Sequence, residues 1–158
     1  MKNLAFLLLL VCSSTAALAC DCIMYPLKQH VREAPYLLTG EVIEILDGQT
    51  KEGQEYHRQR HSMNPREDTT TYGYTARIRV MEGFKGNFGA GDTITIESAY
   101  TGCDVLFKIG EQYVLFLHQE KNVLLTTHCS YSARMDNSPY VAQQMAVIRN
   151  ESQSRRKR

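Results

Sequence analysis

Apolar and polar positions alternate along much of the chain in the way that β-strands require. The clearest segment runs from Thr71 to Val80, where every second residue is apolar and the residues between are threonine, glycine or arginine. A period of two places one apolar face against a core. Four more segments are rich in β-branched and aromatic residues and end at turn-forming residues. These predicted strands span 36–46, 93–97, 112–117 and 123–127.

One helix is predicted before the strands and one after them. Pro26 to Ala34 forms a short helix, because proline suits a first turn and Pro35 ends the segment. Ser138-Pro139 begins a second helix that runs to about Arg149. Five strands with short turns and two flanking helices predict a mainly β fold, a small closed barrel. The buried side of the second helix is expected to comprise Tyr140, Val141, Met145 and Ile148.

Residues 47–70 break the strand pattern, because they are polar and carry scattered charges of both signs together with Gly48, Gly53 and Pro65. They predict a long exposed loop or an extension of a hairpin. His57 and His61 are four residues apart, which would place both imidazoles on one face of a helix. A metal site would need that helix and further ligands. A solvated loop is therefore the expectation.

Residues 1–19 predict a secretory signal peptide. Lys2 precedes an uninterrupted apolar run from Leu4 to Val11, and Ala17-Leu18-Ala19 is a typical cleavage triplet. The run is far shorter than the ~20 residues that span a bilayer, so no membrane span is expected. The prediction is a secreted, extracellular chain with a single domain over 20–150 and a basic tail over 151–158.

Cysteine positions add a constraint on the N-terminus. Cys12 leaves with the signal, and the four cysteines that remain predict two disulfides in an exported protein. A bridge between Cys20 and Cys22 would close a strained ring. Each therefore pairs with one of the downstream cysteines, Cys103 and Cys129, and the spacing alone leaves both pairings open.

Charge and motifs exclude several classes of function. The formal net charge is +1, and the basic run Arg155-Arg156-Lys157-Arg158 is expected to be a solvated end or a contact for a polyanion. Nucleic-acid binding is not expected, because no aromatic residues are interleaved with the basic run. No Ser-His-acid arrangement, glycine-rich phosphate loop or zinc-ligand cluster stands out, so neither an enzyme nor a cofactor of its own is predicted.

Three features together suggest a family. Cys20-x-Cys22 directly follows the signal and precedes a helix that begins with proline. The segment from Tyr74 to Gly86 is a strand with a Phe-Lys-Gly turn at its end. The run from Leu124 to Tyr131 encloses Cys129. In this order, and over nearly all of residues 20–158, the chain resembles the inhibitory N-terminal domain of the tissue inhibitors of metalloproteinases, within the netrin-like group.

The resemblance implies a five-stranded OB-like Greek-key barrel with the disulfides Cys20–Cys103 and Cys22–Cys129. The family's third bridge in this domain, from the first helix to a cysteine after the barrel, has no counterpart here.

The resemblance also implies that the amine and carbonyl of Cys20 chelate the catalytic zinc of a target protease. This zinc is bound by the protease and is no cofactor of this chain. Asp21 would then enter the specificity pocket beside the zinc. The remaining contacts implied are Cys22, Ile23 and Met24 along the cleft, with Ala99, Tyr100, Thr101 and Gly102 as a second edge.

Asp21 departs from the family pattern, because vertebrate members carry a small hydroxyl residue or similar there. A carboxylate in a deep apolar pocket costs several kcal/mol unless it is paired. Weak inhibition of collagenase-type enzymes is therefore expected, and a target with a basic or wet pocket fits better.

Two alternatives stay open. Cys20 and Cys22 could staple the terminus of a secreted netrin-like module that binds something other than a protease. Ala17-Leu18-Ala19-Cys20 also approximates the lipid-attachment box of bacterial lipoproteins, which would place the chain in the periplasm on a lipid anchor. Acylation of Cys20 would leave one of the other three cysteines without a partner, so cysteine parity favours a bridged Cys20.

Overall fold

A computed structural model describes residues 22, 25–63, 65, 72–98 and 103–156. The strands are β1 (Tyr36–Ile45), β2 (Tyr72–Gly73), β3 (Ala76–Lys85), β4 (Thr93–Glu97), β5 (Phe107–Lys108), β6 (Gln112–Glu120), β7 (Val123–Leu125) and β8 (Ala133–Arg134). The helices are α2 (Leu27–Glu33), α3 (Lys51–Met63) and α4 (Pro139–Arg156), with short 3-10 turns η1 (Asp47–Gln49) and η3 (His128–Ser130).

Five strands close into a barrel in the order β1-β3-β4-β7-β6, because β6 pairs back onto β1. The neighbours in this ring run antiparallel except β4 and β7, which pair in parallel. β8 adds to β6, and β2 and β5 form a separate two-stranded sheet. The predicted mainly β fold, an OB-like barrel with flanking helices, is confirmed.

Strands β1 and β6 are buried on both faces, which explains their nearly continuous apolar sequence. Leu38 and Leu115 point into the barrel and belong to its interior core. Their neighbours Leu37 and Phe116 point outward and pack under α2 and α4. The outer core is completed by Val31, Val114, Val141, Met145 and Ile148. Two cores therefore share one wall of the barrel.

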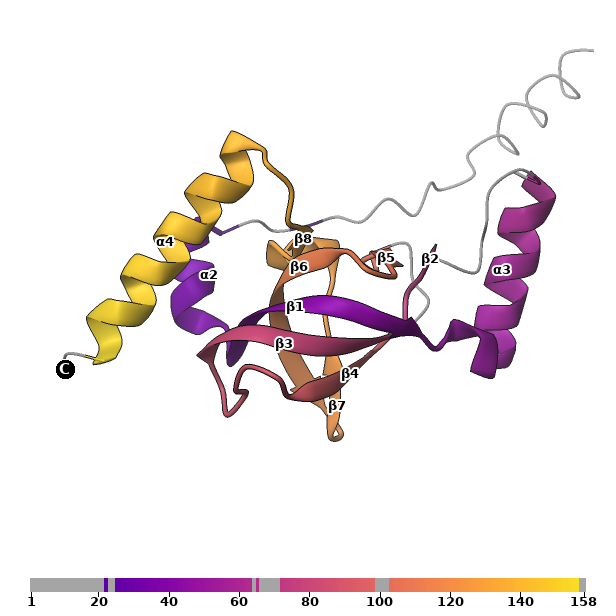
Figure 1. Ribbon diagram of the computed structural model, residues 1–158, viewed down its shortest axis with the longest axis horizontal. Coiled ribbons are helices and arrows are strands. Elements are labelled where there is room, and N and C mark those ends of the chain that lie inside the picture. Colours follow the sequence, from indigo (N-terminus) through magenta and orange to yellow (C-terminus); the bar gives the residue numbers. More distant parts are fainter. Residues whose placement is uncertain (1–21, 23–24, 64, 66–71, 99–102, 157–158) are drawn as a thin grey trace, which may run out of the picture.

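Helices α2 and α4 lie side by side on one side of the barrel (Figure 1). Glu151 of α4 joins them through ion pairs with Lys28 at 3.0 Å and with Arg32 at 2.8 Å. Hydrogen bonds from both cations lower the pKa of the Glu151 carboxyl. At the C-terminal end of α2, Lys85 of β3 donates to the carbonyl oxygens of Val31, Arg32 and Ala34. The last carbonyls of a helix lack intrahelical partners, so Lys85 caps α2 and fixes it to the barrel.

The prediction of a long exposed loop over residues 47–70 is wrong for most of that range. Residues 51–63 form α3, which lies at the end of the barrel away from α2 and α4 (Figure 1). Pairs at i,i+3 and i,i+4 support this helix, since Glu55 contacts both Arg58 and Gln59. The region is thus an ordered helical insertion between β1 and β3.

Other boundaries differ from the expectation. Strand β3 continues to Lys85, so Phe84 and Lys85 of the predicted Phe-Lys-Gly turn belong to the strand, and the chain turns only at Gly86, whose φ is +88°. Helix α4 runs beyond Arg149 to Arg156, because Glu151 binds α2. Tyr140 is 56% exposed instead of buried. Among the residues described, no helix is both long and apolar enough to cross a membrane.

Candidate functional site

Most residues of the expected protease-contact site lie outside the described part of the chain. This holds for Cys20, Asp21, Ile23 and Met24 at the N-terminus, and for residues 99–102 in the second edge. Cys22 is described, as are the residues on both sides of 99–102. The residues that attach both segments to the barrel therefore lie within the described part of the chain.

Cys22 is bridged to Cys129 across 107 residues, with the two Cα atoms 5.2 Å apart. This disulfide was expected and is confirmed. Cys103 is disulfide-bonded as well, and its expected partner Cys20 lies outside the described residues. Cys129 is the middle residue of η3, which follows the last barrel strand. The N-terminal segment is thus covalently held at the end of the barrel wall.

The residues that flank 99–102 are attached beside the same turn. Ser98 donates a hydrogen bond of 2.6 Å to the buried carboxylate of Asp104, so the two flanks of the segment are joined. The backbone N–H of His128 donates to the carbonyl of Cys103 at 2.8 Å. His128 therefore hydrogen-bonds to Cys103, the residue that follows segment 99–102. Its neighbour Cys129 is bridged to Cys22 of the N-terminal segment.

Three hydroxyl groups form a compact cluster around η3. The Thr126 and Ser132 oxygens are 2.6 Å apart, and Ser130 lies 2.9 Å from Ser132 and 3.2 Å from Thr126. Thr126 donates to the Phe116 carbonyl, and Ser132 accepts from the Phe116 N–H at 2.8 Å. Buried hydroxyls satisfied in this way order the backbone that they contact. The cluster therefore ties η3, and with it Cys129, to β6.

Tyr131 directly follows η3 and adopts a left-handed conformation, with φ 64° and ψ 8°. This region costs a residue with a side chain about 1–2 kcal/mol, and glycine is usual there. Three contacts hold Tyr131 in place. Its carbonyl accepts a hydrogen bond from the buried Gln144 at 2.7 Å, its ring meets the His30 ring edge to face at 5.0 Å, and its hydroxyl donates to the Tyr25 carbonyl at 2.8 Å.

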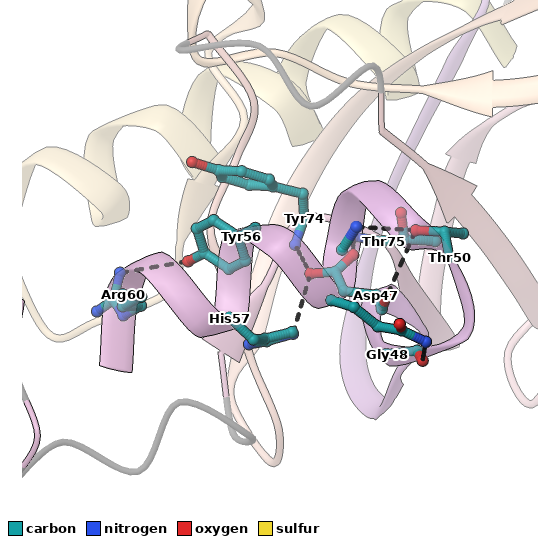
Figure 2. Close-up of polar contacts among 10 residues, drawn as sticks. Asp47, Gly48, Thr50, Tyr56, His57, Arg60, Tyr74 and Thr75 are labelled. Carbon is teal, nitrogen blue, oxygen red and sulfur yellow. Dashed lines mark hydrogen bonds and ion pairs between the residues drawn. The ribbon is translucent and has the colours of Figure 1, made fainter. Parts of the chain in front are cut away.

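A second polar cluster fixes α3 to the barrel. The fully buried carboxylate of Asp47 accepts hydrogen bonds from the backbone N–H groups of Tyr74 at 2.5 Å and Thr75 at 2.7 Å. Figure 2 shows His57 of α3 on the same carboxylate, with its Nε2 at 3.8 Å from the oxygen. A buried side-chain carboxyl is accommodated when its oxygens accept hydrogen bonds from backbone N–H groups. Asp47 is therefore a structural anchor for the insertion.

Two tyrosines pack beside this anchor, Tyr56 of α3 and Tyr74, with ring centroids 4.6 Å apart. Burial is the main cause that raises the pKa of each hydroxyl. The charge of Asp104 raises the pKa of Tyr74 further. Tyr74, which packs against Tyr56 of α3, therefore also lies within the electrostatic range of Asp104.

The histidine pair does not form a metal site. A metal site on this pair would need a helix, and α3 supplies one although a loop was expected. Even so, His57 turns to Asp47, whereas His61 is exposed. Within the ranges that the structure describes, no group of three or more histidine, cysteine, aspartate or glutamate residues could hold a metal ion.

Sequence reasoning missed the two polar clusters. The hydroxyl residues around Cys129 were visible as a dense run, but their convergence depends on β6 pairing. Asp47 had no distinguishing pattern, because its partners are backbone N–H groups 27 and 28 residues away.

No protein-family model matches the chain, and a search of curated proteins finds no significant match.

Proposed function

We propose that this chain is a secreted inhibitor of zinc metalloproteases, and that the α-amine and carbonyl oxygen of Cys20 chelate the catalytic zinc of the target. A catalytic zinc keeps three protein ligands and one exchangeable water. An adjacent amine and carbonyl close a five-membered chelate ring on such a metal and displace the water. No side-chain chemistry is needed for this step.

Protonation is compatible with the chelate. The amine must be unprotonated to bind zinc, and an α-amino group has a pKa of about 8. The metal competes with the proton, so binding near neutral pH is accessible. A Cys20 thiol engaged in a disulfide would not compete as a softer ligand for the same zinc.

The observation that supports the proposal is the shared anchorage of the two expected contact segments. Cys22 is bridged to Cys129, and the Cys103 carbonyl is hydrogen-bonded to the neighbouring His128. Segments whose bases are fixed before binding lose less conformational freedom on association. This frame is what an inhibitor that inserts a short stretch of backbone into a cleft requires.

Asp21 sets the expected selectivity. Beside the zinc, its carboxylate would meet the specificity pocket of the protease. A deep apolar pocket would desolvate this charge without pairing it, at a cost of several kcal/mol. We therefore expect weak inhibition of enzymes with such pockets and tighter inhibition of those whose pocket is basic or hydrated.

The test compares two forms of the exported protein whose N-termini and masses have been determined. One begins at Cys20, and the other carries one additional alanine before Cys20. A panel of zinc proteases with apolar and with basic pockets is assayed with both. The proposal predicts inhibition by the first form, with basic-pocket enzymes inhibited more tightly, and a loss of at least a hundredfold for the second.

Equal behaviour of both forms on every enzyme would refute chelation and would leave a netrin-like module that does not inhibit. A lipid adduct on Cys20 in the mass spectrum, or cleavage at another residue, would also overturn the proposal.

A further inference from the structure

Three residues beyond Cys22, the N-terminal segment meets a second attachment point. Tyr131 donates its hydroxyl hydrogen to the Tyr25 carbonyl at 2.8 Å, a contact between residues 106 positions apart in the sequence. Cys129 holds Cys22, and Tyr131 holds Tyr25. The stretch 22–25 is therefore fixed at both ends by residues from one short turn and its cap.

The disulfide alone leaves the direction of this stretch undefined, because rotation about its side-chain bonds can swing the backbone that follows. A second fixed point, three residues along the chain, removes that freedom. We infer that Tyr131 is a positioning residue for the proposed contact segment, because it holds the Tyr25 carbonyl while Cys129 holds Cys22.

Local geometry supports a dedicated role for Tyr131. Its left-handed backbone is the conformation in which glycine is usual, yet this position carries a large side chain. Strained residues persist where the surroundings determine them and where a side chain must point in one direction. Here Gln144, only 1% exposed, holds the Tyr131 carbonyl, and the hydroxyl bonded to Tyr25 lies at the other end of the residue.

His30 packs against both tyrosines, and the three residues Tyr25, His30 and Tyr131 are called the clamp below. Its imidazole contacts both tyrosines, with ring centroids 5.0 Å from Tyr131 and 5.9 Å from Tyr25. Phe116 of β6 supports both His30 and Tyr131 from behind, at 6.4 and 6.3 Å. Because His30 belongs to α2, the clamp joins the N-terminal segment, the first helix and the barrel wall.

The effect on inhibition rests on the proposed function, whereas the clamp can be tested without it. Tyr131→Phe removes only the hydroxyl and keeps the ring contacts. Tyr36→Phe is the matched control, since it also removes a tyrosine hydroxyl that bonds a distant residue, Gln119, at 2.7 Å. Amide hydrogen exchange of residues 22–25 is measured in both free variants, together with inhibition constants on the protease that the parent chain inhibits best.

The expected result is exchange at 22–25 that is about fivefold faster in Tyr131→Phe and unchanged in Tyr36→Phe, with a five- to tenfold weaker inhibition constant only in the former. Unchanged exchange in Tyr131→Phe would refute the clamp. Faster exchange with unaltered inhibition would refute the positioning role. If the parent chain inhibits no zinc protease but exchange accelerates as expected, the proposed function fails and the clamp stands.

Discussion

At the scale of single residues, polar groups inside the barrel are held by backbone atoms. The hydroxyl of Tyr113 accepts a hydrogen bond from the Lys108 N–H at 3.0 Å and donates to the Leu106 carbonyl at 3.3 Å. Its ring packs against Phe107 in the barrel core. Burial raises the pKa of this phenol to about 12, because the fold disfavours the phenolate. Loss of the Tyr113 proton would remove the bond donated to Leu106 and leave a charged phenolate in the core.

We expect the free energy of unfolding to fall as the pH rises from about 10 to about 12. An unfolded tyrosine ionises near 10, whereas folded Tyr113 keeps its proton to about 12. The folded state thus binds more protons over this window, so increasing pH favours unfolding. Urea unfolding at several pH values across this window measures how the free energy of unfolding changes with pH. In Tyr113→Phe, the number of protons released on unfolding that this change reports should be smaller by about one. The same slope in both proteins would contradict the account.

Conformation at individual positions was the hardest feature to predict. The pairing of Cys22 with Cys129 followed from a resemblance, whereas spacing alone allowed either downstream cysteine. The left-handed Tyr131 could not be foreseen, because no glycine or asparagine marks the position. Its conformation is imposed by contacts with Gln144, His30 and Tyr25, which come from three other parts of the chain.

At the scale of elements, helix α3 shows where hydrophobic periodicity fails as a guide. The strands were predictable, because Ala76, Ile78 and Val80 alternate with exposed residues in β3. Helix α3 has no apolar stripe, since it docks through Gly53, Tyr56 and His57 onto the Asp47 region. A helix fixed by polar contacts and by close backbone approach carries a weak pattern.

Gly53→Ala should destabilise the protein, although alanine normally favours a helix by about 1 kcal/mol over glycine. A β-carbon at residue 53 would overlap the backbone carbonyl of Asp47, which cannot move without disturbing the anchor. The matched control is Gly48→Ala, because nothing lies within 4 Å of the added carbon there.

Thermal unfolding of both alanine variants measures the difference. We expect a loss of roughly 1–3 kcal/mol for Gly53→Ala, in the range of overpacked sites, and a small change for Gly48→Ala. A stabilised Gly53→Ala would show that α3 does not pack against Asp47 as described.

At the scale of the whole molecule, the closed barrel carries helices at two separate places. Helices α2 and α4 cover the wall formed by β1 and β6, and α3 extends the opposite end (Figure 1). The N-terminal segment joins this body between α2 and η3, through Cys129 and Tyr131. The closed barrel and its flanking helices were predictable from strand count and turn lengths. The convergence of α2, η3 and the N-terminal segment was not, since it depends on contacts between distant residues.

Our central proposal is that the N-terminal amine of this chain binds the zinc of another protein. Its most direct test uses a zinc protease whose metal is replaced by cobalt(II), because cobalt absorbs visible light in a way that depends on its ligands. The chain that begins at Cys20 should change this spectrum with a stoichiometry of one to one, since a nitrogen and a carbonyl oxygen displace water. The form with one extra alanine should leave the spectrum unchanged. An unaltered spectrum with the first form, or the same change with both, would contradict the account.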